Sequence, residues 1–402
     1  MEKYLRLFSS EQEFNEAYNG EEYIEPWTSY ILENERVDYN KSEDEKRKGQ
    51  PLTFIAREDG TFRFSGSTEN NTLNYSLDKG ATWAALGHDT ESPTVTSGNS
   101  IMFKGTCNPI IDQGIGKFYA TGEFDAEGNV MSLLFGDNFR TQDSLADKNR
   151  VFYSLFMSNT KIINSEKIVL PATTLSNGCY HAMFCYCSNL VSMPKLPATT
   201  MTENAYNYMF RNCRSLTAVT DLPATTLAAG CYSSMFEGCS SLTAVQTILP
   251  ATTLAAGCYS SMFAGCSGIT ATPILPATTL AYGCYENMFN RCSGLTQVST
   301  LPATTLAEKC YDGMFYECIS LTTAPDLPAA TLVDYCYYRM FNSCTALKNV
   351  KCLATDITAS QCTTNWLTNV ASRGTFTKAA SMNDWTSGGS GIPTNWTVED
   401  AN

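Results

Sequence analysis

Between residues 170 and 350 the apolar side chains recur in a fixed pattern. The phrase Leu-Pro-Ala-Thr-Thr-Leu occurs seven times with slight drift, and its copies begin at Leu170, Leu196, Leu222, Leu249, Leu275, Leu301 and Leu327. Successive copies lie 26 residues apart, except that the third step is 27 residues long. Such a period is typical of a solenoid, in which each repeat buries its apolar side against its neighbours.

Each copy continues with the same apolar residues. In the fourth copy they are Cys258, Tyr259, Met262, Phe263, Cys266 and Ile269. Counted from Cys258, the offsets 0, 1, 4, 5 and 8 lie on one face of an α-helix, so we expect a helix of about two to three turns in every copy. Thr253 precedes Leu254 and is expected to cap the N-terminus of this helix through its hydroxyl.

The segment between two such helices, for example Leu216–Leu222, is expected to form a short parallel strand that ends at Pro223. The extra residue between Leu242 and Leu249 predicts a local bulge and not a break in the stack. Degenerate copies at both ends extend the predicted solenoid to residues 128–373, because end repeats have no neighbour to cover them.

Residues 51–127 are predicted to form a small, sandwich-like all-β domain. Leu52–Arg57 and Thr61–Phe64 flank Asp59-Gly60, which indicates a hairpin. A second hairpin is expected around Asn74–Leu86, and Ser100–Lys104 is a further extended run.

The two terminal segments of the chain are expected to anchor it to a partner and to cap the solenoid. Residues 1–50 contain 13 Asp and Glu against 7 Lys and Arg, together with Trp27, and are interpreted as an arm that anchors the chain to a protein partner. Residues 374–402 contain Trp385 and Trp396 and are interpreted as a cap over the last repeat.

The 26-residue unit and its repeated phrase resemble the BspA-type leucine-rich-repeat surface proteins of gut anaerobes and similar repeats carried by their phages. The resemblance covers about residues 128–373. It implies an α/β solenoid of the leucine-rich-repeat type, a right-handed stack of short parallel strands and short helices. The opening segment, Met1–Phe8, is also similar to the starts of phage-encoded repeat proteins.

Charge and hydropathy limit the classes of partner. The formal net charge of −13 argues against nucleic acid and against an anionic membrane surface. No segment approaches the roughly 18–20 apolar residues that cross a bilayer, so no membrane insertion is expected. The N-terminus has no apolar stretch followed by small residues, so we expect no secretory signal peptide.

The 17 cysteines predict a ladder of buried thiols. Within one predicted helix the two cysteines of a copy would lie about 12 Å apart, which is too far for a disulfide. Ala205 replaces one of them, as a small core residue can. Metal sites need clustered Cys or His ligands, and the chain has two His, so neither a metal nor another cofactor is expected.

One phrase points to a different function. Residues 76–83, Ser-Leu-Asp-Lys-Gly-Ala-Thr-Trp, resemble the Asp-box phrase of sialidase-like propellers. Propeller enzymes carry several copies and this chain has one, so we favour a hairpin whose Asp78 ties the turn and whose Trp83 packs inside. A glycan-active enzyme built on this hairpin stays the second alternative.

A candidate contact surface is predicted on the variable side of the repeats. It comprises Tyr208, Arg211, Tyr282, Arg291, Tyr316, Tyr338 and Arg339. Tyr and Arg are enriched where proteins bind partners. Ordinary variation of exposed residues is the alternative explanation.

These expectations favour a non-enzymatic adhesion or attachment protein. The leading hypothesis is a structural component of a bacteriophage virion (fibre, tail or head decoration), located on the virion surface, which displays the solenoid to a bacterial-surface protein or glycan. The alternative is a BspA-type adhesin on the bacterial cell surface. A homo-oligomer is one alternative for its assembly, because attachment proteins are often symmetric.

Overall fold

The computed structural model describes residues 42–66, 73–109 and 114–401. The chain divides into two compact units, Met1–Lys46 and Arg47–Asn402. The predicted acidic arm, with Trp27, lies almost wholly outside the described residues. The described elements are α2 (Glu43–Lys48), β1 (Leu52–Ala56), β2 (Phe62–Gly66), β3 (Leu73–Ser76), β4 (Ala84–Leu86), β5 (Ser100–Gly105), β6 (Gly116–Ala120), β7 (Phe124–Asn129), α3 (Ser132–Phe135), η1 (Gly136–Thr141), β8 (Ile162–Val169), β9 (Asn349–Cys352), β10 (Thr375–Lys378) and β11 (Thr397–Asp400).

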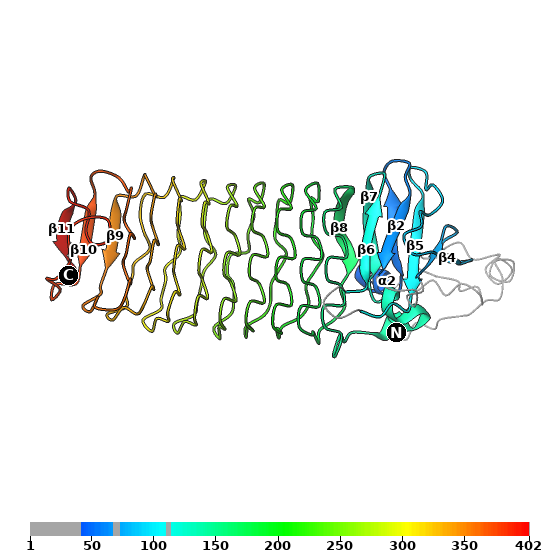
Figure 1. Cartoon of the computed structure of the whole chain (residues 1–402), viewed down its shortest axis with the longest axis horizontal. Coiled ribbons are helices and arrows are strands. Elements are labelled where there is room, and N and C mark those ends of the chain that lie inside the picture. Colours follow the sequence, from blue (N-terminus) through cyan, green and yellow to red (C-terminus); the bar gives the residue numbers. More distant parts are fainter. Residues whose placement is uncertain (1–41, 67–72, 110–113, 402) are drawn as a thin grey trace, which may run out of the picture. The chain divides into compact units, whose positions relative to one another are not determined.

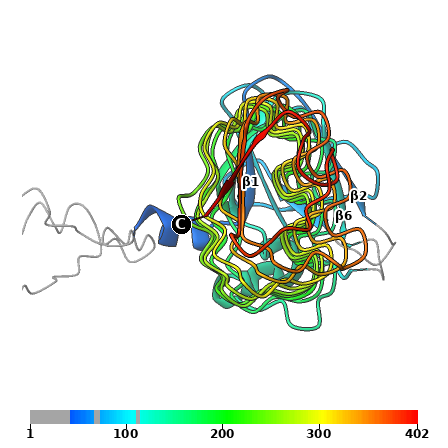
Figure 2. The same cartoon turned by 90° about the vertical axis from the view of Figure 1, so that its left-hand side faces the viewer.

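The repeats of the second unit form a solenoid in which one 26-residue copy makes one coil (Figure 1). Viewed along the stack, successive coils superimpose (Figure 2). Equivalent phenylalanines stack from Phe156 to Phe341, with centroids 5.2–5.8 Å apart and planes within 10° of each other. A second ladder of rings runs from Tyr180 to Tyr337. These buried ladders form the core, as the repeat pattern predicts.

The predicted helices of the repeats are wrong. In the coil that contains Phe263, the amides of Gly257, Tyr259, Ser261, Phe263 and Gly265 donate to carbonyls of the next coil at 2.7–3.0 Å. The amides between them donate to the carbonyl three residues back. The run is therefore a series of tight turns that hydrogen-bonds between coils. Among the described residues, helical segments are confined to α2, α3 and η1.

The cause of this error lies in the period of the pattern. Offsets 0, 1, 4, 5 and 8 repeat every four residues, whereas an α-helix turns every 3.6 residues. In addition, every fourth residue has a positive φ, as at Gly257 (58°), Ser261 (54°) and Gly265 (73°). A right-handed helix cannot contain such residues at regular intervals.

Thr253 is likewise not a helix cap. It is exposed and forms a parallel bridge with Thr226 of the preceding coil. Between residues 170 and 348 the predicted parallel pairing consists of isolated bridges, such as Ala218 with Ala244. The extra residue of the fourth copy does not interrupt the stack, since Ile248 bridges Ile274. The Gln246 side chain accepts a 2.8 Å hydrogen bond from the amide of Leu222 in this region.

The N-terminal strands form two sheets. A six-stranded sheet has the order β4-β3-β5-β1-β7-β8, and a two-stranded sheet consists of β2 and β6. The hairpin predicted at Asp59-Gly60 is wrong, because β1 pairs with β5 and β7 whereas β2 pairs with β6. Both edges of β1 are occupied, so the chain crosses to the other sheet. The second predicted hairpin is present as β3 and β4.

The N-terminal sheet continues into the solenoid. Strand β7 pairs in parallel with β8, which belongs to the first coil. Phe54 and Phe118 from the two sheets contact Phe156, with ring centroids 5.9 and 5.8 Å from it. One hydrophobic core therefore extends through the β-rich region and the coils.

At the other end, β10 and β11 extend β9 as a three-stranded parallel sheet. Trp385 stacks on Trp366, which itself stacks on Tyr337, the last tyrosine of its ladder. The indole Nε1 of Trp396 donates to the carbonyl of Ala371 at 2.8 Å. Aromatic rings thus cover the final coil.

Candidate functional site

The outward side chains of the turn series form a variable face on the solenoid. In each coil this face consists of the residues between and beside the buried Cys-Tyr, Met-Phe and Cys positions. In the coils of residues 229–238 and 256–265 it carries almost only Ala, Gly and Ser. The backbone therefore needs no large side chain at these positions.

Two stretches of this face are different, although the backbone is the same. Residues with positive φ include Tyr208 (56°) near one end, and Lys309 (57°) and Tyr335 (56°) near the other. The positions of Lys309 and Tyr335 hold Gly257 in the coil of residues 256–265. Large side chains at left-handed positions cost conformational energy, and such strain concentrates at functional sites. We name these stretches the N-terminal patch (Arg150, Tyr153, His181, Asn207, Tyr208, Arg211 and Glu237) and the C-terminal patch (residues 282–291, 308–317 and 334–339).

The N-terminal patch is a row of aromatic and charged side chains. The ring of His181 lies 5.2 Å from that of Tyr153 and 5.6 Å from that of Tyr208. The guanidinium of Arg211 lies 5.1 Å from the Tyr208 ring and donates to Glu237 at 2.8 Å. Burial, together with the charge of Arg150, lowers the pKa of His181 to about 4. The imidazole is therefore neutral at physiological pH.

The C-terminal patch is built around Lys309. Its ammonium lies 5.6 Å from the ring centroids of both Tyr282 and Tyr335, which come from the preceding and the following coil. The ring of Tyr335 meets that of Tyr338 edge-on at 5.5 Å, and the guanidinium of Arg339 lies 4.8 Å from the Tyr338 ring. These contacts fix several aromatic faces at the surface.

Two carboxyl groups lie within the same patch. Glu286 and Asp312 occupy equivalent positions in adjacent coils, and both are half-buried. Burial, and secondly the charge of Glu286, raise the pKa of Asp312 to about 6, against the opposing charges of Lys309 and Arg339. Burial also raises the pKa of Glu286, and Lys309 opposes this shift. Their side chains form no hydrogen bond or ion pair with other described residues.

The seven residues of the predicted contact surface fall into these two groups. Tyr208 and Arg211 lie in the N-terminal patch, and Tyr282, Arg291, Tyr316, Tyr338 and Arg339 lie in the C-terminal patch. Sequence reasoning missed Lys309, Tyr335 and the carboxyl pair. An available signal was that Lys309 and Tyr335 replace a glycine of other copies. That these residues bind a partner stays a prediction.

The single Asp-box-like phrase forms the turn of the β3–β4 hairpin. Asp78 accepts hydrogen bonds from Ser76 Oγ, Thr82 N and Thr82 Oγ1 at 2.5–2.9 Å. Hydrogen bonds from Thr82 and Ser76 lower the pKa of Asp78 to about 2. Trp83 is only half-buried, beneath the ammonium of Lys104, and so does not pack inside as predicted. Asp78 holds the turn and has no proton to donate at neutral pH.

The thiols line the core and connect the coils. All seventeen cysteines are free and buried. The second cysteine of each copy donates to a phenylalanine carbonyl of the preceding coil, as Cys266 does to Phe236 at 3.0 Å. Burial raises the pKa of Cys258 and Cys292 to about 12. Such groups do not react as nucleophiles at neutral pH.

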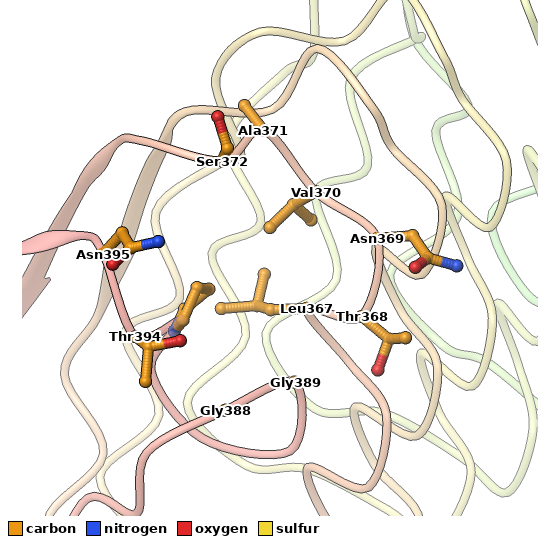
Figure 3. Close-up of a pocket in the computed structure, with 11 residues that line it drawn as sticks. Leu367, Thr368, Asn369, Val370, Ala371, Ser372, Gly388, Gly389, Thr394 and Asn395 are labelled. Atoms are coloured by element: carbon orange, nitrogen blue, oxygen red, sulfur yellow. The ribbon is translucent and has the colours of Figure 1, made fainter.

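A depression of about 260 Å³ lies where the last turns meet the C-terminal residues (Figure 3). Leu367 and Val370 lie at its centre, with Thr394 and Asn395 on one side and Asn369 on the other. Its volume is below the roughly 300–1,000 Å³ that is usual for ligand pockets. In the part of the chain that the structure describes, no three His, Cys, Asp or Glu side chains are grouped as metal ligands would be.

Comparisons with known proteins agree with the repeat architecture. A family model described as BspA type leucine-rich repeat region matches in six copies, over residues 153–287 and 259–380, which together are more than half of the chain. A solved leucine-rich repeat protein from Bacteroides ovatus ATCC 8483 has 15% identity over 62% of this chain and 77% of its own, with a TM-score of 0.25. No curated protein matches the chain. Among the described residues, no helix has the length and apolar character needed to cross a membrane.

Proposed function

Because the chain belongs to the BspA-type leucine-rich-repeat family, we propose that it is an adhesion or attachment protein that acts by binding and not by catalysis. The observation that carries this proposal is the distribution of large side chains over the variable face. They gather in two patches, at positions where other coils hold Ala, Gly or Ser with the same backbone. A difference that folding does not require is best explained by a partner.

The solenoid suits this role because its shape does not depend on the variable face. The ladders of Phe and Tyr rings and the hydrogen bonds between coils hold every coil in register. Side chains on the variable face are therefore displayed on a rigid support and bind with little loss of freedom. The proposed partner of the variable face is a protein or a glycan on the bacterial surface.

We further propose that the chain is a bacteriophage virion component and that its N-terminal region attaches it to the particle. This finer proposal is supported by the resemblance of the repeats to those that phages carry. The alternative location is the bacterial cell surface, as for BspA-type adhesins. Protein mass spectrometry of purified virions and of washed cell envelopes tests the choice. Presence in virions supports the leading proposal, and presence only in envelopes supports the alternative.

Adhesion itself is tested by adding the purified, labelled full chain to intact bacteria. Saturable binding to cells is expected. Because each patch spans several coils, replacing Tyr208 and Arg211, or Tyr282 and Tyr338, with Ala should reduce binding at least about tenfold. Ser261→Ala, at the position equivalent to Tyr208 on the Ala/Gly/Ser stretch, is the matched control. Absence of binding to any host cells would contradict the proposal.

Catalysis is not part of the proposal. Asp78 is held by three hydrogen bonds in a turn, and the pKa of this carboxyl is depressed. Release of sugar from mucin-type glycans by the purified chain, abolished by Asp78→Ala in a variant that still folds, would replace adhesion with glycan hydrolysis.

A further inference from the structure

The C-terminal patch has a chemistry of its own that points to one class of ligand. Lys309 and Tyr335 have φ values of 57° and 56°, at the position that is Gly257 in the coil of residues 256–265. The same coil geometry thus forms with glycine. Folding therefore does not explain why two successive coils carry a lysine and a tyrosine at this strained position.

The tyrosine rings of the patch are held in place before any ligand arrives. Lys309 lies between the rings of Tyr282 and Tyr335, and Tyr338 packs edge-on against Tyr335. Tyr282 is 48% exposed, so part of its ring is open to solvent. Rings fixed in this way offer flat apolar faces at little entropic cost. The C–H face of a sugar ring packs well on such a surface.

Beside these rings, Glu286 and Asp312 need hydrogen-bond donors. Both carboxyl groups are half-buried, and neither forms a hydrogen bond or ion pair with another described side chain. Acceptors that lose water without gaining a donor are costly, and the lost bonds are restored when a ligand supplies O–H or N–H groups. The hydroxyls of a saccharide are donors of this kind, and neighbouring hydroxyls suit neighbouring acceptors.

The charges around this pair favour a neutral ligand. The ammonium of Lys309 acts on both carboxyl groups, and Arg339 acts on Asp312. Arg291 and Glu317 form a 2.9 Å ion pair on the same patch. A cationic or anionic partner would meet charges of its own sign here, whereas a neutral polyhydroxylated one would not.

We propose that the C-terminal patch binds a neutral saccharide, with Glu286 and Asp312 accepting hydrogen bonds from its hydroxyls and with Tyr282 and Tyr335 packing against its rings. This inference rests on the proposed adhesive function and names the partner class of one of its two patches.

The test uses the full chain and an array of oligosaccharides. The probes are neutral glycans of hexoses and N-acetylhexosamines, with sialylated and sulfated glycans as the charged set. We expect retention by at least one neutral glycan that changes less than about twofold when salt is raised, since no net ion pairing is involved. Glu286→Ala and Asp312→Ala should each weaken retention at least about tenfold, because each removes an acceptor.

The matched controls are Ser260→Ala and Ser233→Ala, which change the equivalent positions of the two preceding coils. They should leave retention unchanged. Glu286→Gln, which keeps the shape and one acceptor oxygen, should retain more binding than Glu286→Ala, and this separates lost hydrogen bonding from damaged folding. Circular dichroism verifies that each variant is folded.

Several outcomes would overturn the inference. These are no retention by any neutral probe, retention only by charged probes with strong salt dependence, or retention that survives the loss of both carboxyl groups. If intact cells are still bound in those cases, the adhesive function stands and only the saccharide assignment fails. If cells are not bound either, the adhesive function fails too.

Discussion

The ring of Phe118 in β6 lies 5.8 Å from the ring of Phe156, with 19° between their planes. Phe156 is also the first member of the phenylalanine ladder, since it stacks on Phe184. This pair joins the β-rich region to the solenoid. The first coil is thereby covered by a folded region, which solves the problem that a solenoid end has no neighbour.

Replacement of Phe156 by Ala should destabilise the protein by about 3–5 kcal/mol, as truncation of buried aromatic residues does. The same cost is expected for Phe263→Ala in the middle of the ladder, because both rings are fully buried. Unfolding by urea, followed by circular dichroism, measures both. Ile319→Ala, at an exposed position, is the control. A cost below about 1 kcal/mol would mean that these rings are not in the core.

The two cysteines of a coil should differ in their tolerance of alanine. Cys266→Ala removes a buried sulfur and its hydrogen bond to the Phe236 carbonyl, so we expect a loss of about 1–2 kcal/mol. Cys258→Ala should cost less than about 1 kcal/mol, since Ala205 occupies the equivalent place in another coil. Urea midpoints of the two variants decide the order. Equal losses of unfolding free energy in the two variants would contradict a structural role for the hydrogen bond from the Cys266 thiol to the Phe236 carbonyl.

Stability should fall in alkali. The pKa of Cys258 and of Cys292 is about 12 in the folded chain, against 9.0 for an ordinary thiol, so the folded state holds these protons more tightly. Stability that is present below about pH 9 is therefore lost progressively as the pH rises towards 12. Melting temperatures across this range test the trend.

Iodoacetamide should label few thiols in the native chain and all of them in urea, because the cysteines are buried. Rapid labelling of the native protein would argue against the buried ladder of thiols.

Asp312→Asn should stabilise the protein at neutral pH. Burial, and secondly the charge of Glu286, raise the pKa of Asp312 from 3.8 to about 6, despite Lys309 and Arg339. Ionisation of this carboxyl therefore destabilises the folded state increasingly as the pH rises from 3.8 to about 6. The gain in melting temperature should be small near pH 4 and should grow until about pH 6. Ser260→Asn, at the same position of another coil, is the control and should show no such pH dependence. A gain in melting temperature that does not change with pH would contradict the raised pKa of Asp312.

The candidate site could be predicted only in part. Tyr and Arg at variable positions indicated a candidate contact surface from their residue types alone, and that this surface binds a partner stays a prediction. The importance of Lys309 depends on its place between Tyr282 and Tyr335, which are 27 and 26 residues away in the sequence. Such neighbours become visible only when the register of the coils is known. Glu286 and Asp312 appeared as scattered surface charges for the same reason.

The sequence by itself determined the repeat, its length and the identity of the core. A side chain such as Phe263 recurs in phase with its equivalents, and burial follows from that period whatever the backbone does. Only the tertiary structure decided the backbone path between Cys258 and Cys266. Its alternate amides find their carbonyl partners in the next coil, as Phe263 does at Met288. Hydrogen bonds between coils replace those of a helix, and a local pattern of apolar residues cannot distinguish the two.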